Sequence, residues 1–120
     1  MLKQEYRLQK SRDFKHAYSR GRVAVNDLMV LHSIKRTKEP ELGIRIGFVV
    51  SKKQGGSVVR NRIRRRLREA VRQILMDMPA TPIDLVFVGK AKVNSSSWEE
   101  VFGGMKALLI KVGVVRGEKA

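Results

Sequence analysis

The feature that most constrains the fold is a series of apolar residues spaced three and four apart between residues 57 and 78. This spacing predicts a long helix with one buried face, beginning at the N-cap candidate Ser57 and ending before Pro79. Residues 57–72 hold seven arginines against a single acid, Glu69. Because only one stripe of this helix can be buried, it must pack on the outside of a domain. The buried stripe is expected to comprise Val59, Ile63, Leu67, Ala70, Val71, Ile74 and Met78.

Three other segments have the patterns of β-strands. Residues 22–35 carry apolar side chains on both faces, so this strand is expected to be covered on both sides. Residues 43–50 place apolar side chains at alternate positions, and residues 83–89 are almost entirely apolar, which predicts a central strand. The first strand is expected to direct Val23, Val25, Met29 and Leu31 one way and Leu28, Val30, His32 and Ile34 the other.

Two shorter helices are expected on either side of these elements. Ser11 is a candidate cap for a helix that begins at Arg12 and ends at Gly21. Ser97 and Glu100 have the spacing of a capping box at the start of the last helix. The apolar faces are Phe14, Ala17 and Tyr18 in the first helix, and Val101, Phe102, Met105, Leu108, Leu109 and Val112 in the last.

The order helix, strands, helix, strand, helix predicts an α+β fold, a single-domain α/β sandwich. It would have one mixed central sheet of about four strands with three helices packed on it. A chain of 120 residues has room for one domain with one modest core. Residues 1–10 are expected to form a basic, extended arm, and residues 113–120 a disordered tail.

The charge balance indicates a polyanionic partner. Lys and Arg total 26 against 11 acids, a formal net charge of +15, and a small protein with this imbalance repels itself unless an anion is bound. Nucleic acid is the commonest such partner, and an anionic membrane surface is the alternative. The sequence has no apolar run long enough to cross a bilayer, no signal-peptide pattern and no cysteine, which makes the cytoplasm the expected location.

The arginines of the long helix are the expected binding surface. A solvated helix face normally mixes charges of both signs at i,i+4, whereas here like charges repeat at that spacing, as at Arg60 and Arg64. A guanidinium donates two parallel hydrogen bonds to phosphate and stacks on bases, which suits structured RNA. Lys52 and Lys53, in a glycine-bearing loop before the helix, extend this basic surface.

The acidic residues do not have the pattern of a catalytic site. A metallonuclease needs two or three converging carboxylates to hold hard cations against phosphate, and the eleven acids here are scattered along the chain. No histidine pair is spaced for acid–base ribonuclease chemistry either. We therefore expect no catalytic residue, no metal ligand and no cofactor bound by the protein alone.

Taken together, these segments resemble the protein subunit of bacterial ribonuclease P, the ribonucleoprotein that removes the 5′ leader from precursor transfer RNA. Residues 48–72, FVVSKKQGGSVVRNRIRRRLREAVR, match that family's strand ending in Ser-Lys-Lys, its glycine-bearing loop and its Arg-Asn-Arg helix. Residues 11–21, SRDFKHAYSRG, match its first helix, and residues 83–89 match its late strand. The resemblance covers the chain from about residue 8 to residue 109.

The resemblance implies a left-handed βαβ crossover, against the usual hand, and two binding surfaces. It also implies that the RNA subunit performs Mg²⁺-dependent hydrolysis, with one protein per RNA, and that membranes and DNA are not partners. The surface for the catalytic RNA would comprise Lys52, Lys53, Arg60, Asn61, Arg62, Arg64, Arg65, Arg66, Arg68 and Arg72. The cleft for the single-stranded leader would comprise Arg12, Phe14, Tyr18, Val30 and His32, where His32 replaces the family's more common aromatic residue.

Several alternatives remain open at the level of sequence. A ribosomal or other structural RNA-binding protein without an enzymatic role would have the same composition, and only the matched motifs separate the two classes. In a DNA-binding regulator the recognition helix would follow a helix and a tight turn, not a strand and a glycine loop. Individually, Phe14 and Tyr18 could be core residues, His32 a structural histidine, Arg66 a solvated residue, and Asn61 a partner of its local backbone.

Overall fold

A computed structural model describes residues 7–8, 10–37, 40, 43–75 and 81–115 of the chain. Its elements are α1 (Ser11–Arg20), β1 (Arg22–Val25), β2 (Met29–Lys35), β3 (Arg45–Val49), a 3-10 turn (Lys52–Gln54), α2 (Ser57–Ile74), β4 (Ile83–Gly89), the one-turn α3 (Lys92–Ser95) and α4 (Trp98–Lys111). The predicted α+β class is confirmed, with α3 added to the three expected helices.

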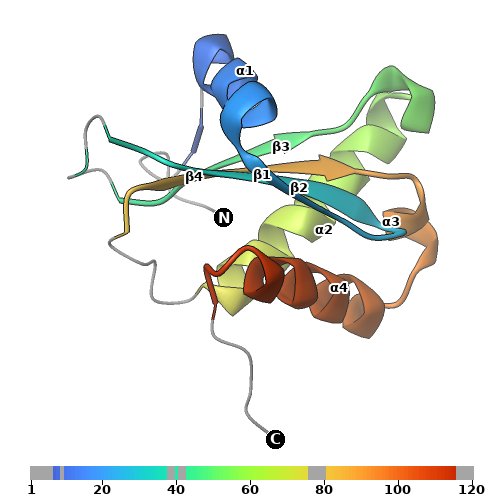
Figure 1. The fold of residues 1–120 in the computed structure, drawn as a ribbon. Coiled ribbons are helices and arrows are strands. Elements are labelled where there is room, and N and C mark those ends of the chain that lie inside the picture. Colours follow the sequence, from blue (N-terminus) through green and yellow to red (C-terminus); the bar gives the residue numbers. More distant parts are fainter. Residues whose placement is uncertain (1–6, 9, 38–39, 41–42, 76–80, 116–120) are drawn as a thin grey trace, which may run out of the picture.

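The four strands form one mixed sheet in the order β1-β2-β4-β3. β1 and β4 pair antiparallel with β2, and β3 pairs parallel with β4. β4 therefore lies inside the sheet, as its apolar sequence predicted. Figure 1 shows α1 on one face of the sheet and α2 and α4 on the other.

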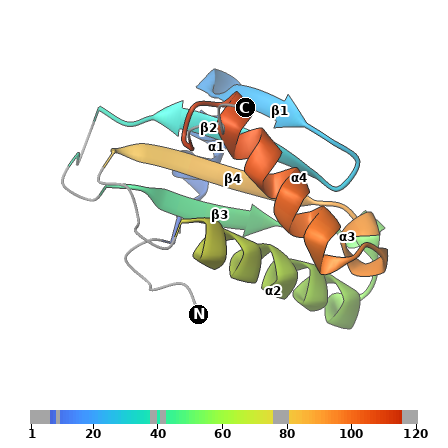
Figure 2. The same ribbon diagram turned by 90° about the horizontal axis from the view of Figure 1, so that it is seen from below.

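The parallel pair β3 and β4 is connected through α2. In Figure 2, α2 lies in front of the sheet, and β3 and β4 run in the same direction. With both strands turned to point upward, β4 lies to the left of β3, so the chain makes a left-handed crossover. The usual hand is right-handed; the left-handed connection agrees with the expectation drawn from the family resemblance.

Two clusters of buried residues lie on the two faces of the sheet. The larger cluster fills the space between the sheet, α2 and α4, and includes Met29, Leu31, Phe87, Ile63 and Met105. The smaller cluster lies under α1 and consists of Leu8, Ala17 and Val86 with partly buried neighbours. The α1 face is therefore the more thinly covered of the two, and it leaves part of the sheet accessible.

The single strand expected at residues 22–35 is wrong, because the segment is a hairpin of β1 and β2. The Asn26 carboxamide oxygen accepts hydrogen bonds from the backbone N–H groups of Leu28 and Met29, at 2.9 and 3.0 Å, which closes the turn. Val23 pairs with His32 and Val25 with Val30, so both valines share the α1 face with those residues. A single continuous strand predicts the opposite face for both valines. Asn and Asp at positions 26 and 27 are turn residues and could have indicated the break.

The helix ends also differ from expectation. Ser11 and Ser57 are the first residues of α1 and α2, and the N-cap positions are held by Lys10 and Gly56 without a side-chain cap bond. α2 ends at Ile74, and the expected extension to Met78 lies outside the described residues. Within the described part of α2, Ile63, Leu67, Ala70 and Val71 are buried as expected.

The predicted start of the last helix is confirmed. Ser97 Oγ accepts from the Glu100 backbone N–H, and the Glu100 carboxylate accepts from the Ser97 backbone N–H, which completes a capping box. Gly104 of α4 faces the hairpin turn, where the Asn26 side chain donates to its carbonyl oxygen at 3.1 Å. A Cβ atom at Gly104 would lie 3.2 Å from Asn26 and Leu28, so the glycine allows this close approach.

Candidate nucleic-acid interface

The exposed face of α2 carries the predicted arginine surface. Arg62 and Arg65 are exposed and form no hydrogen bond or ion pair with any residue that the structure describes. The Asn61 carboxamide oxygen accepts a hydrogen bond from Arg64 at 3.0 Å, so Asn61 orients a neighbouring guanidinium. The exposed guanidinium groups of Arg62 and Arg65 lie on the same helix as the oriented Arg64. Together they form a surface suited to phosphate.

Two of the predicted arginines are bound within the protein. Arg66 donates through Nη1 to the carbonyl oxygens of Val93 and Ser96, the latter at 2.9 Å, and so joins α2 to the end of α3. Arg72 forms an exposed ion pair with Glu69. The hydrogen bonds from Arg72 and Gln73 lower the pKa of Glu69 to about 2. These contacts favour a structural role for Arg66 and leave Arg72 partly neutralised.

Arg68 lies on an aromatic ring. Its guanidinium carbon is 5.8 Å from the centroid of Phe48, and Phe48 in turn stacks on Phe87 with centroids 5.9 Å apart. Burial, together with the positive charges of Arg7, Arg64 and Arg65, lowers the pKa of Arg68. Arg68 is therefore held in a fixed position among like charges.

The lysine loop precedes α2 as predicted. Lys52 and Lys53 are exposed on the 3-10 turn Lys52–Gln54. The side chain of Gln54 accepts from the Ala91 backbone N–H at 2.8 Å, which ties the loop to the end of β4. Gly55 has φ +143°, a conformation that favours glycine. Both lysines thus lie at the N-terminal end of the arginine surface.

On the other side of the sheet, Tyr18 and His32 form an exposed aromatic pair. Their ring centroids are 4.7 Å apart in an edge-to-face arrangement, and Tyr18 is 41% exposed. Burial raises the pKa of Tyr18 and lowers that of His32. His32 Nδ1 is buried and has no hydrogen-bond partner among the described residues. With half-buried Val30 nearby on β2, these rings form a surface on which bases could stack.

Phe14 is engaged in packing beside this surface. Its ring lies directly over Gly47 of β3, where an added Cβ would come within 2.5 Å of the ring. The glycine therefore permits α1 to approach the sheet. Phe14 is only partly buried, so its packing role leaves part of the side chain accessible.

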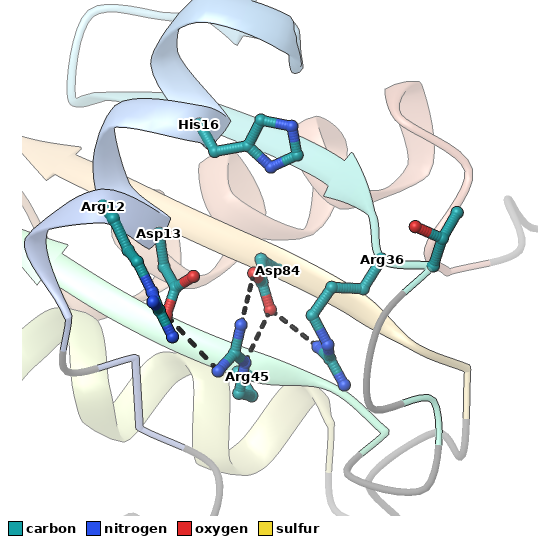
Figure 3. A pocket seen from close by; sticks show the side chains of 7 residues that line it. Arg12, Asp13, His16, Arg36, Arg45 and Asp84 are labelled. Atoms are coloured by element: carbon teal, nitrogen blue, oxygen red, sulfur yellow. Dashed lines mark hydrogen bonds and ion pairs between the residues drawn. The ribbon is translucent and has the colours of Figure 1, made fainter.

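Arg12 does not join Tyr18 and His32. At 100° per residue, Arg12, Asp13 and His16 lie along one flank of α1 and Phe14 and Tyr18 along the other. Arg12 lines a separate cavity of about 500 Å³ with Asp13, His16, Arg36, Arg45 and Asp84 (Figure 3). The family resemblance places Arg12 with the leader residues, whereas in the structure Arg12 lines a cavity that Tyr18 and His32 do not border.

The floor of this second cavity is a buried ionic network. The Asp84 side chain is 3% exposed and accepts hydrogen bonds from Arg36 at 2.7 Å and from Arg45 at 2.9 Å. Arg45 also lies 3.4 Å from the Asp13 carboxylate (Figure 3). Arg36 follows β2, Arg45 lies in β3 and Asp84 in β4, so their ion pairs join the ends of these three strands. The pair between Arg45 and Asp13 connects them to α1.

The described residues contain no group of three or more His, Cys, Asp or Glu side chains arranged to hold a metal ion. Among the same residues, no helix has the length and apolar character needed to span a membrane. Sequence reasoning missed three residues of the α1 face and sheet edge: Val23, Val25 and Arg7. The valines were missed with the hairpin turn, and Arg7 had no local signal.

An α+β sandwich with exposed arginines on one face and an accessible aromatic pair on the other has the features of an RNA-binding protein. Residues 2–113 match the family model described as Ribonuclease P. The ribonuclease P protein components of Gluconacetobacter diazotrophicus and Thermoanaerobacter pseudethanolicus are 39% and 33% identical to the chain. The first match covers 95% of this chain and 97% of its relative, and the second covers 99% of each. The chain therefore belongs to the ribonuclease P protein family.

Solved structures agree with this assignment. The RNase P protein of Staphylococcus aureus is 24% identical and matches the fold with a TM-score of 0.77, over 91% of this chain and 96% of its own. The RNase P protein of Thermotoga maritima is 26% identical, with a TM-score of 0.64 over 92% of this chain and 98% of its own.

Proposed function

We propose that this chain, the non-catalytic protein subunit of a ribonuclease P, binds the catalytic RNA through its α2 surface and the 5′ leader of precursor transfer RNA through its α1 face. The α2 surface is defined here as the side chains of Lys52, Lys53, Arg60, Asn61, Arg62, Arg64, Arg65 and Arg68. The α1 face is defined as those of Phe14, Tyr18, Val23, Val25, Val30 and His32.

The observation that carries this proposal is the difference between the two faces of the sheet: one carries exposed arginines, and the other carries exposed aromatic and apolar side chains. Arg62 and Arg65 have no partner among the described residues, and like charges surround Arg68. On the opposite face, Tyr18, Val23 and Val25 are 41%, 52% and 54% exposed. Arginines suit a phosphate backbone, whereas aromatic and apolar side chains suit unstacked bases.

The division of labour follows from what the two surfaces contain. Neither surface offers converging carboxylates, so the hydrolysis belongs to the RNA subunit and its Mg²⁺ ions. The protein contributes binding energy and positive charge, which reduce the metal concentration needed to hold two polyanions together. We also propose one protein per catalytic RNA, as the resemblance to the family implies.

Reconstitution tests this function. The purified protein is added to ribonuclease P RNA and a precursor transfer RNA at a Mg²⁺ concentration too low for the RNA alone. The expected result is removal of the leader to give the mature 5′ end. A structural RNA-binding protein of another class would leave the precursor uncut under the same conditions.

A further inference from the structure

The solvent side of α1 carries a set of cations that belongs to neither of the two proposed surfaces. The exposed cations of the helix and its N-cap are Lys10, Arg12, Lys15 and Arg20. None of the four forms a hydrogen bond or an ion pair with any residue that the structure describes. We call these side chains the α1 basic surface. Asp13, the acid of this helix, is engaged elsewhere, because its carboxylate lies 3.4 Å from Arg45.

The position of these cations around the helix separates them from the leader surface. Ala17 is the buried residue of α1 and marks the side that faces the sheet. At about 100° per residue, Lys15 and Arg12 lie within roughly 40° of the opposite, outward direction. Tyr18 lies about 60° around the helix from Lys15, on the flank where its ring contacts His32. The basic surface is therefore adjacent to the aromatic pair but faces a different way.

The charges of α1 do not serve the stability of the helix. Lys10 and Arg12 lie at its N-terminal end, where the helix dipole favours anions and disfavours cations. Arg12 and Lys15 are like charges at i,i+3, a spacing at which side chains are neighbours and like charges repel. Of the four cations, Arg20 is the one in the last turn, where a positive charge is favourable. A bound polyanion would relieve the repulsion among the others.

The side chains between the cations indicate the form of the nucleic acid. Ser11 and Ser19 are exposed, and Ser19 Oγ donates to the Lys15 carbonyl oxygen at 3.0 Å, so its lone pairs can still accept. A single strand is held mainly by rings on which its bases stack. Double-stranded RNA is instead bound through its phosphates and 2′-hydroxyl groups. The outward side of α1 offers cations and hydroxyls, which suit a duplex.

The place of α1 in the fold indicates which duplex this is. The α2 arginines lie across the sheet from α1 (Figure 1), so RNA bound there is on the far side of the protein. Lys15 and Tyr18 are i,i+3 neighbours on α1, so a leader stacked on Tyr18 and His32 passes beside the basic surface. The leader is covalently continuous with the 5′ strand of the acceptor stem. That stem is therefore the duplex that the leader brings next to α1.

We propose that the α1 basic surface binds phosphates of the double-stranded stem of transfer RNA that adjoins the leader. The helix then contacts two parts of the precursor: its aromatic flank binds the unpaired leader, and its outward side binds the stem. The proposal rests on the proposed function, since it requires that the precursor be held on the α1 side of the protein. It gives a role to Arg12, which lies apart from Tyr18 and His32.

The test uses the full-length protein in reconstituted holoenzyme, with the variants Arg12→Gln, Lys15→Gln and the double variant. Lys111→Gln is the matched control, because it also removes one positive charge from an exposed helical residue, on the opposite side of the sheet. Affinities for mature and precursor transfer RNA are measured over a range of salt concentrations, at protein concentrations that saturate the ribonuclease P RNA. A separate titration measures the binding of each variant to ribonuclease P RNA.

The double variant should weaken binding of mature and precursor transfer RNA by the same factor, because both contain the stem. The slope of log affinity against log salt should fall by roughly 2 units for both RNAs, the value for two phosphate contacts. The ratio of precursor to mature affinity, which reports the leader, should stay constant, and so should binding to ribonuclease P RNA. Lys111→Gln should change none of these quantities. Melting curves should show no loss of stability, since both replaced side chains are exposed and make no contact of this kind.

Three results would overturn the proposal. Unchanged affinity of the double variant for mature transfer RNA would show that the stem does not contact this surface. A loss confined to the precursor would assign the surface to the leader, and a loss in the titration with ribonuclease P RNA would assign it to the catalytic RNA. Failure of the unmodified protein to bind ribonuclease P RNA, or to favour precursor over mature transfer RNA, would instead refute the proposed function. The two failures are therefore distinguishable.

Discussion

At the scale of single residues, the α1 face depends on a few side chains whose exposure is unusual for their type. Tyr18 and His32 contact each other edge to face, yet both remain accessible enough to meet a ligand. An aromatic pair of this kind can stack on any of the four bases, because every base offers a π-face. The position of His32 at its centre also makes the surface sensitive to a single substitution.

Tyr18→Ala and His32→Ala should each weaken binding of precursor transfer RNA to the holoenzyme. If each removes one stacking contact of roughly 1 to 3 kcal/mol, affinity falls by about 5- to 150-fold. Mature transfer RNA and ribonuclease P RNA should bind almost unchanged. The measurement compares substrate and product affinities with saturating protein, and a melting curve excludes loss of folding. Equal losses for precursor and mature RNA from a folded His32→Ala protein would refute the leader assignment.

A second prediction at the residue scale concerns the contribution of Asp84 to the stability of the fold. Its carboxylate is buried and accepts from Arg36 and Arg45, so Asp84→Asn removes the charge that balances two guanidinium groups. Breaking a buried pair on one side costs about 3 to 5 kcal/mol of the free energy of unfolding. Glu69→Gln, which breaks the exposed pair with Arg72, is the control and should cost far less, because water screens an exposed pair. Urea denaturation of both variants checks this, and similar midpoints would contradict it.

At the scale of elements, α2 combines a buried stripe with an arginine face, and the two sides are independently testable. Replacing Arg60, Arg62 and Arg65 together by Ala should lower affinity for ribonuclease P RNA and reduce its salt dependence. Three lost phosphate contacts correspond to a slope smaller by roughly 2 to 3 units. A titration series over salt concentration measures the slope. A triple variant with unchanged slope and affinity would show that this face does not bind the RNA.

The element scale also shows how far sequence alone could go. Apolar spacing predicted α2, the central strand β4 and the capping box of α4, because these depend on local periodicity and local hydrogen bonds. The β1–β2 hairpin was missed, because the alternation of apolar residues was extended across Asn26 and Asp27, although both are turn-forming residues. Helix α3 is too short for periodicity to reveal.

The residues of the candidate sites likewise fall into those that local spacing predicts and those that only tertiary packing brings into place. The arginine surface was predictable, since helical spacing alone places those residues outside the buried stripe of α2. The contacts of Arg66 with the end of α3, and the distance of Arg12 from Tyr18, depend on tertiary packing and had no local signal. Arg7 likewise lies beside Ile46 through backbone pairing with a strand that is far along the chain.

At the scale of the whole molecule, the purified protein should have no nuclease activity of its own with any divalent metal. Phosphodiester hydrolysis by a protein needs carboxylates that hold the cation, and the described residues provide no such group. A labelled precursor incubated with protein and Mg²⁺ or Mn²⁺, without RNA subunit, should remain intact. Cleavage at the mature 5′ end that disappears when one Asp or Glu is replaced would contradict this division of labour.

The placement of α1 and α2 on opposite faces of one sheet has a geometric consequence (Figure 1). A packed core is nearly incompressible, so the protein is a spacer of fixed thickness between whatever binds its two sides. Two mutually repelling RNA strands could then be held at a constant offset without touching. Core substitutions that change this thickness, rather than any residue in contact with RNA, would displace one strand relative to the other. If the proposed function holds, volume changes at buried side chains such as Phe87 and Met105 would be expected to shift the site of cleavage.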